Sequence, residues 1–280
     1  MAVSGFWRRK WINRIMLILC GCAAALCILI LGLIVGHTIA NGINYLNIDF
    51  LTHQSAPTGE LGGGMRDDIY GTFILVALGS IIALPIGLMA GIYLAEFGSS
   101  AVASVVRFTA DILAGVPSIV MGVFVYALMV RPMGRFSALS AGVALAIIMI
   151  PVVARTAEEA MRLVPNSMRE AALALGINRW RAVLGVVVPG ALTGIITGIM
   201  LAVARIAGET APLLFTALGS AFGVQGLLGP IGALPLKIYQ YALSPYKDWQ
   251  QQAWAAALLL MILVLGINII VRTVSRRKSM

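Results

Sequence analysis

Two opposite charges stand four residues apart in the stretch ARIAGETAPLL, where Arg205 and Glu209 interrupt a long apolar run. An ionisable residue inside a membrane costs at least ~2.5–3.5 kcal/mol on insertion scales, so such residues indicate function by default. The alternative is a structural ion pair, because residues i and i+4 share one face of a helix and can neutralise each other. We interpret the pair as a candidate substrate site. In this interpretation Arg205 and Glu209 pair with each other only while substrate is absent.

The chemistry that these side chains offer suits an oxyanion. The guanidinium of Arg205 can bind two oxygens at once and stays charged. The carboxylate of Glu209 accepts a hydrogen bond from an O–H group, which phosphate keeps at neutral pH and sulfate lacks. Thr210 adds a hydroxyl next to the pair. The pair would therefore discriminate between oxyanions with and without a proton, because an unprotonated one would meet an unpaired negative charge. These residues alone leave the identity of the oxyanion open.

The composition of the chain shows what must position these residues. Hydrophobic residues make up 60% of the 280 residues and charged residues 11%, whereas soluble domains average about 25% charged residues. The apolar runs are long and continuous, and a spanning helix needs roughly 20 apolar residues. A β-barrel would instead show alternating segments of about ten residues. The sequence predicts an all-α integral membrane protein whose residues 1–280 form a single transmembrane domain.

Basic residues gather at the two ends of the chain and account for most of its net charge of +9. We read this charge as a topology signal and expect no nucleic-acid partner. By the positive-inside rule both termini are cytoplasmic, which requires an even number of spans. The residues concerned are Arg8, Arg9, Lys10 and Arg14 before the first span, and Arg272, Arg276, Arg277 and Lys278 after the last.

Six spans satisfy this requirement. The stretch 210–236 is also uncharged, but it is rich in glycine and proline, so we expect a looped or partly inserted segment there. Arg107 and Asp111 flank the third span on its inner side, where we expect a solvated interface; pairing with the inner loop over residues 155–189 is the alternative. The predicted spans are residues 15–37, 70–94, 112–130, 137–154, 190–214 and 251–271.

The longest inner loop, residues 155–189, contains a well-marked short helix. Ser167 and Glu170 have the spacing of a capping box, and Gly176 is placed to end the helix as a C′ residue. Asn178 can cap the helix that follows. We interpret the short helix as a docking element; an ordinary amphipathic connector is the alternative.

This loop resembles the EAA signature of ABC importer permeases. Glu170-Ala171-Ala172 is followed after three residues by Gly176, and after nine more by VVVP at 186–189. The resemblance implies a type I (MetI-like) permease fold with six spans, with a core over residues 70–272. It also implies that residues 155–189 hold a coupling helix that docks on an ATPase. The implied coupling residues are Arg169, Glu170, Ala171, Ala172 and Gly176.

Several stretches are similar to the permeases of phosphate importers. They are PTGELGGG, ILAGVPSIVMGVF, ARIAGETAPLL and LPLKIYQYALSP, of which the first favours the PstA type over its PstC partner. The resemblance implies a phosphate importer permease in the cell inner (plasma) membrane, with Arg205 and Glu209 handling the substrate. The implied partners, besides membrane lipid, are a PstC-type permease, a PstB-type ATP-binding subunit dimer and an extracytoplasmic PstS-type phosphate-binding protein.

The chain lacks the phosphate-binding motif G-x-x-x-x-G-K-[ST], so we expect it not to hydrolyse ATP and not to be an enzyme on its own. ATP and Mg²⁺ would bind the partner ATPase, and no cofactor, metal site or catalytic residue is expected in this chain. One alternative is a permease of the same fold for sulfate, molybdate or phosphonate. Others are a self-sufficient channel or ion-driven carrier, which would need no ATPase dock, and a sensor partner.

Overall fold

The computed structural model describes residues 3–57, 60, 62–220 and 223–277. Over these residues the chain is built from helices, and its β-pairs are two isolated bridges. The first half contains α1 (Val3–Gly42), α2 (Ile48–Thr52), α3 (Arg66–Glu96), α4 (Ala101–Gly115), α5 (Ser118–Val125), the π-helical η1 (Tyr126–Val130) and α6 (Arg131–Met133). The second half contains α7 (Ala138–Arg162), α8 (Asn166–Ala174), α9 (Arg179–Ala182), the π-helical η2 (Val183–Val187), α10 (Val188–Ala207), α11 (Ala211–Thr216), α12 (Leu234–Ala242) and α13 (Lys247–Arg277).

Five helices are long and apolar enough to cross a membrane, and one bent pair adds a sixth candidate. The bent pair corrects the prediction of a single third span over 112–130. α4 already begins at Ala101, and the chain turns by 103° before it continues from Ser118 to Met133. Pro117 explains the break, because proline lacks an N–H and pushes the residue before it out of the helical region. That residue, Val116, is extended, with φ −73° and ψ 132°.

α3 and α7 form the centre of the bundle and run parallel to each other. Glycines on α3 let the two backbones approach, as small residues do in membrane helix pairs. A Cβ placed on Gly91 would lie 2.6 Å from the carbonyl oxygen of Ala154, and one on Gly87 would lie 2.8 Å from Cβ of Val153. α10 packs antiparallel on α7, where Gly194 lies against Ala160.

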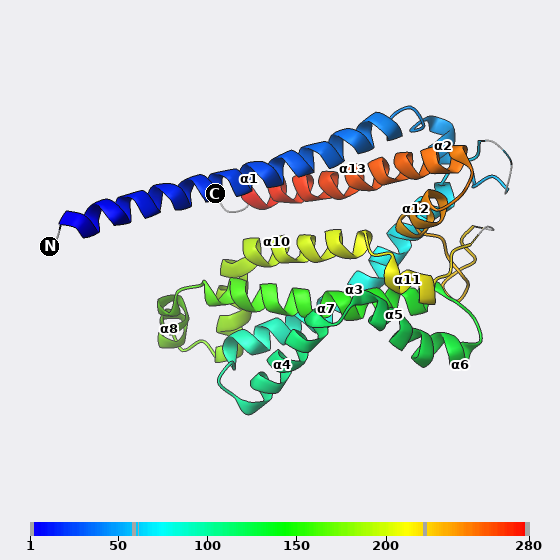
Figure 1. Cartoon of the computed structure of the whole chain (residues 1–280). Helices are drawn as coiled ribbons and strands as arrows, with labels where there is room; N and C mark the ends of the chain where they lie inside the picture. The colour runs from blue at the N-terminus through cyan, green and yellow to red at the C-terminus, as the bar shows by residue number, and fades with distance from the viewer. Residues whose placement is uncertain (1–2, 58–59, 61, 221–222, 278–280) are drawn as a thin grey trace.

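The bundle has two ends, which we name after α8 and α12. The N-terminal end of α1 and the C-terminal end of α13 point towards the α8 end, and α2 lies with α12 at the other (Figure 1). α1 and α13 pair at the α12 end, where the rings of His37 and Trp254 are 5.0 Å apart. Both ends of the chain therefore lie on the same side of the bundle, as an even number of spans requires.

The loop predicted over residues 155–189 is shorter in the structure. α7 continues to Arg162 and α9 begins at Arg179. α7 extends beyond its apolar stretch because ion pairs at i,i+4 spacing stabilise a helix in water. The pairs are Arg155–Glu159 and Glu158–Arg162, with N–O distances of 3.5 and 2.7 Å.

The caps of α8 confirm one prediction and contradict another. The capping box predicted for Ser167 and Glu170 does not form, because the N-cap residue is Pro165 and no side-chain hydrogen bond caps the helix. The predicted stop is confirmed, because Gly176 has a φ of +76°. The N–H of Gly176 donates to the carbonyl of Leu173 at 2.9 Å, and that of Ile177 donates to Ala172 at 3.3 Å, as in a Schellman motif. Asn178 is the N-cap residue of α9, although its side chain makes no capping hydrogen bond.

The looped segment predicted over 210–236 is confirmed for its described residues. After α11 the chain is irregular until α12 begins at Leu234. It covers the start of α7, where the N–H groups of Ser137 and Ala138 donate to the carbonyls of Thr216 and Gly229 at 3.1 and 3.0 Å. The segment thus satisfies backbone donors that a helix leaves unpaired at its N-terminus.

Candidate functional site

Arg205 and Glu209 lie on either side of a helix break. α10 ends at Ala207, with Gly208 as its C-cap, and α11 begins at Ala211 with Pro212 in its first turn. A continuous helix over 190–214, as predicted for the fifth span, is therefore wrong. Proline explains the end, because its ring clashes with the carbonyl four residues earlier, here that of Gly208.

The two charged side chains meet across the break. Nε of Arg205 lies 3.6 Å from Oε1 of Glu209, and the side chains are 51% and 16% exposed. This distance fits an ion pair but is too long for a strong hydrogen bond. The guanidinium therefore keeps donors that can bind another anion.

The pair stands near the middle of the bundle. Ile206, next to Arg205, lies level with Gly79 of α3. A Cβ added to Gly79 would be 3.4 Å from the Cδ1 atom of Ile206. Gly79 is 13 residues after Arg66 and 17 before Glu96, the two ends of α3, or about 20 and 26 Å at a rise of 1.5 Å per residue. A charge at this depth is costly unless it serves a purpose.

Thr210 lies next to the pair, and its hydroxyl faces another helix. Its Oγ1 donates to the carbonyl of Pro235 in the first turn of α12, at 3.5 Å. The backbone N–H of Leu234 in turn donates to the hydroxyl of Thr72 on α3, at 2.8 Å. The residue after Glu209 thus connects the helix break to α12 and α3.

The residues implied in ATPase coupling surround α8. Arg169 turns back towards its own chain: it donates to the carbonyls of Met161 and Val164, each at 2.8 Å, and pairs with Glu96 at 3.1 Å. Its side chain is 19% exposed. Arg169 therefore braces α8 against α3 and α7 rather than pointing away from the bundle.

The other residues implied in coupling differ in how far they are exposed to solvent. Glu170, Ala171 and Gly176 are exposed, whereas Ala172 is buried. Large apolar side chains are also exposed around α8, which on a short polar loop indicates a protein-binding surface. They are Leu163 (84% exposed), Met168 (43%), Leu173 (47%) and Leu175 (81%), and we call these four the α8 patch.

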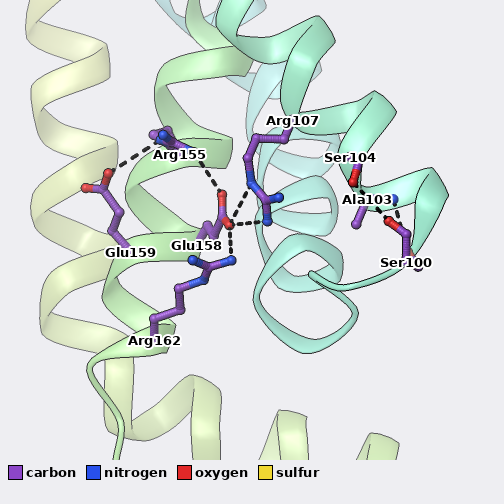
Figure 2. Close-up of polar contacts among 8 residues, drawn as sticks. All are labelled: Ser100, Ala103, Ser104, Arg107, Arg155, Glu158, Glu159 and Arg162. Carbon is purple, nitrogen blue, oxygen red and sulfur yellow. Dashed lines mark hydrogen bonds and ion pairs between the residues drawn. The ribbon is translucent and has the colours of Figure 1, made fainter.

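A charge cluster centred on Glu158 was missed by the sequence reasoning (Figure 2). The carboxylate is 1% exposed and pairs with Arg107, Arg155 and Arg162 at closest N–O distances of 2.8, 3.5 and 2.7 Å. Three cations compensate one buried anion, which would otherwise be strongly destabilising. Arg107 therefore joins α4 to α7, and the expected solvated interface is wrong for it, although Asp111 is exposed. The i,i+4 spacing of Glu158 and Arg162 is the sequence signal that could have indicated this cluster.

No group of three or more His, Cys, Asp or Glu side chains that could hold a metal ion occurs among the described residues. The three cysteines, Cys20, Cys22 and Cys27, are exposed along α1.

The helical bundle with its broken span matches a known class of membrane permease. The sequence model of the family described as "Binding-protein-dependent transport system inner membrane component" matches residues 83–280. The chain belongs to this family and is a multi-pass membrane protein.

Curated relatives narrow the class. The chain is 43% identical over 274 residues to the "Phosphate transport system permease protein PstA" of Yersinia pestis, covering 98% of this chain and 92% of the relative. It is 44% identical over 275 residues to the protein of the same name from Haemophilus influenzae, covering 98% and 97%. These relatives place the chain in the PstA branch of the family.

Solved structures support the MetI-like permease fold. A bacterial ABC transporter that imports alginate matches with a TM-score of 0.64 and 14% identity, over 99% of both chains. The MetNI methionine ABC transporter matches with a TM-score of 0.60 and 24% identity, over 77% of this chain and 94% of the other. At these identities the likeness concerns the fold alone.

Proposed function

We propose that the chain is one permease subunit of an ATP-driven importer of inorganic phosphate and forms half of the translocation pathway. The observation that carries the proposal is the half-exposed guanidinium of Arg205, held 3.6 Å from Glu209 at mid-depth beside a helix break. The names of the PstA relatives agree with this substrate.

The chemistry of the pair explains how phosphate would be handled. Arg205 supplies charged donors for two phosphate oxygens, and Glu209 accepts a hydrogen bond from the phosphate O–H. While the site is empty, the carboxylate neutralises the guanidinium. Sulfate has no proton at neutral pH, so the carboxylate would repel it. The site is thus selective for a protonated oxyanion.

Movement driven by ATP hydrolysis in a partner subunit would be transmitted to this chain at the α8 end. The α8 patch and the exposed Glu170 and Ala171 offer a surface for an ATP-binding subunit dimer of the PstB type, which would hold ATP and Mg²⁺. Because Arg169 and the Glu158 cluster connect α8 and the end of α7 to α3 and α4, movement of the docked helix would reach the bundle. This chain would hydrolyse no ATP, and rocking of packed helices around a central site would give alternating access.

The remaining subunits are proposed because the chain is similar to PstA permeases. A PstC-type permease would complete the pathway, and an extracytoplasmic PstS-type protein would deliver phosphate at the α12 end. The α8 end, where both chain ends lie (Figure 1), would face the cytoplasm of the cell inner membrane, in agreement with the basic residues at the termini.

Uptake by the reconstituted importer tests the proposal. Loss of bidentate binding costs about 1.5–3 kcal/mol, so we expect Arg205→Lys to reduce labelled phosphate uptake roughly 10- to 100-fold. Glu209→Gln is expected to weaken the preference for phosphate over sulfate. Arg66→Lys is the matched control, since Arg66 pairs with Asp67 at the start of α3, away from the break.

Unchanged transport by both variants would reject the proposal. If both variants reach normal membrane levels, import phosphate at the rate of the unmodified chain and still exclude sulfate, the pair does not handle the substrate. Preferred uptake of sulfate, molybdate or phosphonate by the unmodified importer would instead assign another oxyanion. Uptake without any ATPase would indicate a carrier.

A further inference from the structure

A small polar cavity of about 210 Å³ lies near the α12 end, between the first turn of α3, the chain after α11, and α12. Asp68, Lys237 and Gln240 supply its side-chain charges and amide, and Gly219 and Ser220 also line it. Gly219 has a φ of +86°, and an added Cβ there would lie 3.6 Å from Nε2 of Gln240. The turn at Gly219 therefore brings the backbone close to Gln240 without filling the cavity.

The two charges in this cavity face each other without a close hydrogen bond. Nζ of Lys237 lies 4.0 Å from Oδ2 of Asp68, and the side chains are 13% and 5% exposed. The ammonium also lies 4.8 Å from the ring centroid of Tyr241. At 4.0 Å the charges compensate each other but are too far apart for a hydrogen bond. The Asp68 carboxylate also accepts a hydrogen bond from the side chain of Ser55. A carboxylate has about four acceptor positions and an ammonium three donors, so both groups keep hydrogen-bonding capacity.

The cavity is connected to the helix break that carries Arg205 and Glu209 through contacts with α12 and α3. Thr210 contacts Pro235, which lies two residues before Lys237 on α12. Leu234 contacts Thr72, which lies one turn after Asp68 on α3. Asp68 precedes Gly79, the level of Arg205, by 11 residues, or about 16 Å along α3. The cavity is thus displaced from the pair towards the α12 end.

We propose that Asp68 and Lys237 form an outer binding station, which phosphate occupies before it reaches Arg205, with Gln240 at the exposed rim of the cavity. This inference rests on the proposed function. Both places combine a cation for phosphate oxygens with a carboxylate that can accept the phosphate O–H. A lysine suits a transient station, because its ammonium is a mobile point charge and lacks the rigid fork of arginine. The Gln240 amide adds a neutral donor.

Cysteine labelling in the reconstituted importer tests this station. Cys20, Cys22 and Cys27 are replaced by alanine, and a cysteine is introduced by Gln240→Cys, since Gln240 is exposed. A membrane-impermeant maleimide is added from outside, with inorganic phosphate or with sulfate at equal ionic strength. We expect phosphate to slow labelling several-fold and sulfate to have little effect.

Two further positions make the result specific. Combining Gln240→Cys with Lys237→Gln is expected to abolish the protection by phosphate, and Lys237→Arg is expected to keep it. Tyr239→Cys is the matched control, because Tyr239 is 47% exposed on the same helix and does not line the cavity. Its labelling is expected to be independent of phosphate. Lys237→Arg also separates loss of charge from damage to the fold.

Uptake of labelled phosphate by the same vesicles separates the two proposals. If phosphate is imported but does not slow labelling after Gln240→Cys, the outer station is wrong and the proposed function stands. Equal protection after Tyr239→Cys, or with Lys237→Gln, also overturns the station. If sulfate rather than phosphate is imported and slows labelling, the oxyanion station stands and the assignment to phosphate fails.

Discussion

Charged side chains within the bundle are held in two different ways. Glu158 is enclosed by three arginines with two N–O distances below 3 Å, as expected for a structural ion cluster. Arg205 and Glu209 are 3.6 Å apart, and the arginine side chain is 51% exposed. The first arrangement leaves little capacity for a ligand, whereas the second leaves donors available. The contrast supports a binding role for Arg205 and a structural one for Glu158.

The structural role of Glu158 gives a prediction. Glu158→Gln leaves three arginines facing a neutral amide, and removing one partner of a buried ion pair costs about 3–5 kcal/mol. We expect a clearly lower apparent melting temperature of the purified complex. Glu159→Gln is the matched control: Glu159 is 67% exposed and 3.5 Å from Arg155, and such pairs contribute about 0–1 kcal/mol. Equal effects of both changes would contradict the structural role.

At the scale of elements, the sequence predicts where apolar helices lie better than where they bend. Apolar runs locate the five long spans found among the described residues, because burial in lipid depends on local composition. The 103° turn at Pro117 and the break at Gly208 could not be predicted in their geometry, because a proline can end, bend or merely interrupt a helix. The contact between Arg107 and Glu158 joins residues 51 positions apart, which no local pattern encodes.

The close packing of α3 on α7 gives a prediction for a single glycine. Gly91→Ala would place a methyl group 2.6 Å from the carbonyl oxygen of Ala154, and overpacking of this kind costs about 1–3 kcal/mol. Gly32→Ala on α1 is the control, since nothing lies within 4 Å of an added Cβ there. We expect thermal unfolding to occur at a lower temperature for Gly91→Ala only. Unchanged stability would show that the two helices separate readily.

The α8 patch gives a prediction about assembly. Leu175→Asp introduces a charge at a side chain that is 81% exposed, so the fold of the chain should tolerate it. Because charge is unfavourable in the desolvated centre of an interface, we expect much less ATP-binding subunit to co-purify. Leu243→Asp is the control at the α12 end, where Leu243 is 69% exposed. Normal co-purification of the Leu175→Asp variant would place the ATPase contact elsewhere.

At the scale of the whole molecule, the chain leaves large apolar surfaces for lipid and for other subunits. None of the most apolar window of α1 is buried by the rest of the chain. Both chain ends and α8 lie at one end of the bundle, and α2 and α12 lie at the other (Figure 1). The two ends of the bundle therefore carry different elements, which agrees with the proposed ATPase contact at one end and the proposed delivery of phosphate at the other.

Sidedness can be measured directly. In a chain whose three cysteines are replaced by alanine, Ser167→Cys on α8 is expected to react with an impermeant reagent only from the cytoplasmic side. Asn47→Cys, in the turn before α2, is expected to react only from outside. Basic residues gathered near both termini predict this orientation. The reverse labelling pattern would contradict the proposed topology.

A charge exchange shows whether Arg205 binds the transported anion. Arg205→Glu combined with Glu209→Arg keeps an ion pair at i,i+4 spacing and moves the cation. The single change Arg205→Glu is the reference, because it places two carboxylates together. If Arg205 binds phosphate, the double variant will recover the membrane level and stability lost in the single variant, but phosphate uptake will remain at background. Uptake restored to the level of the unmodified importer would contradict the claim and leave the pair as a structural ion pair.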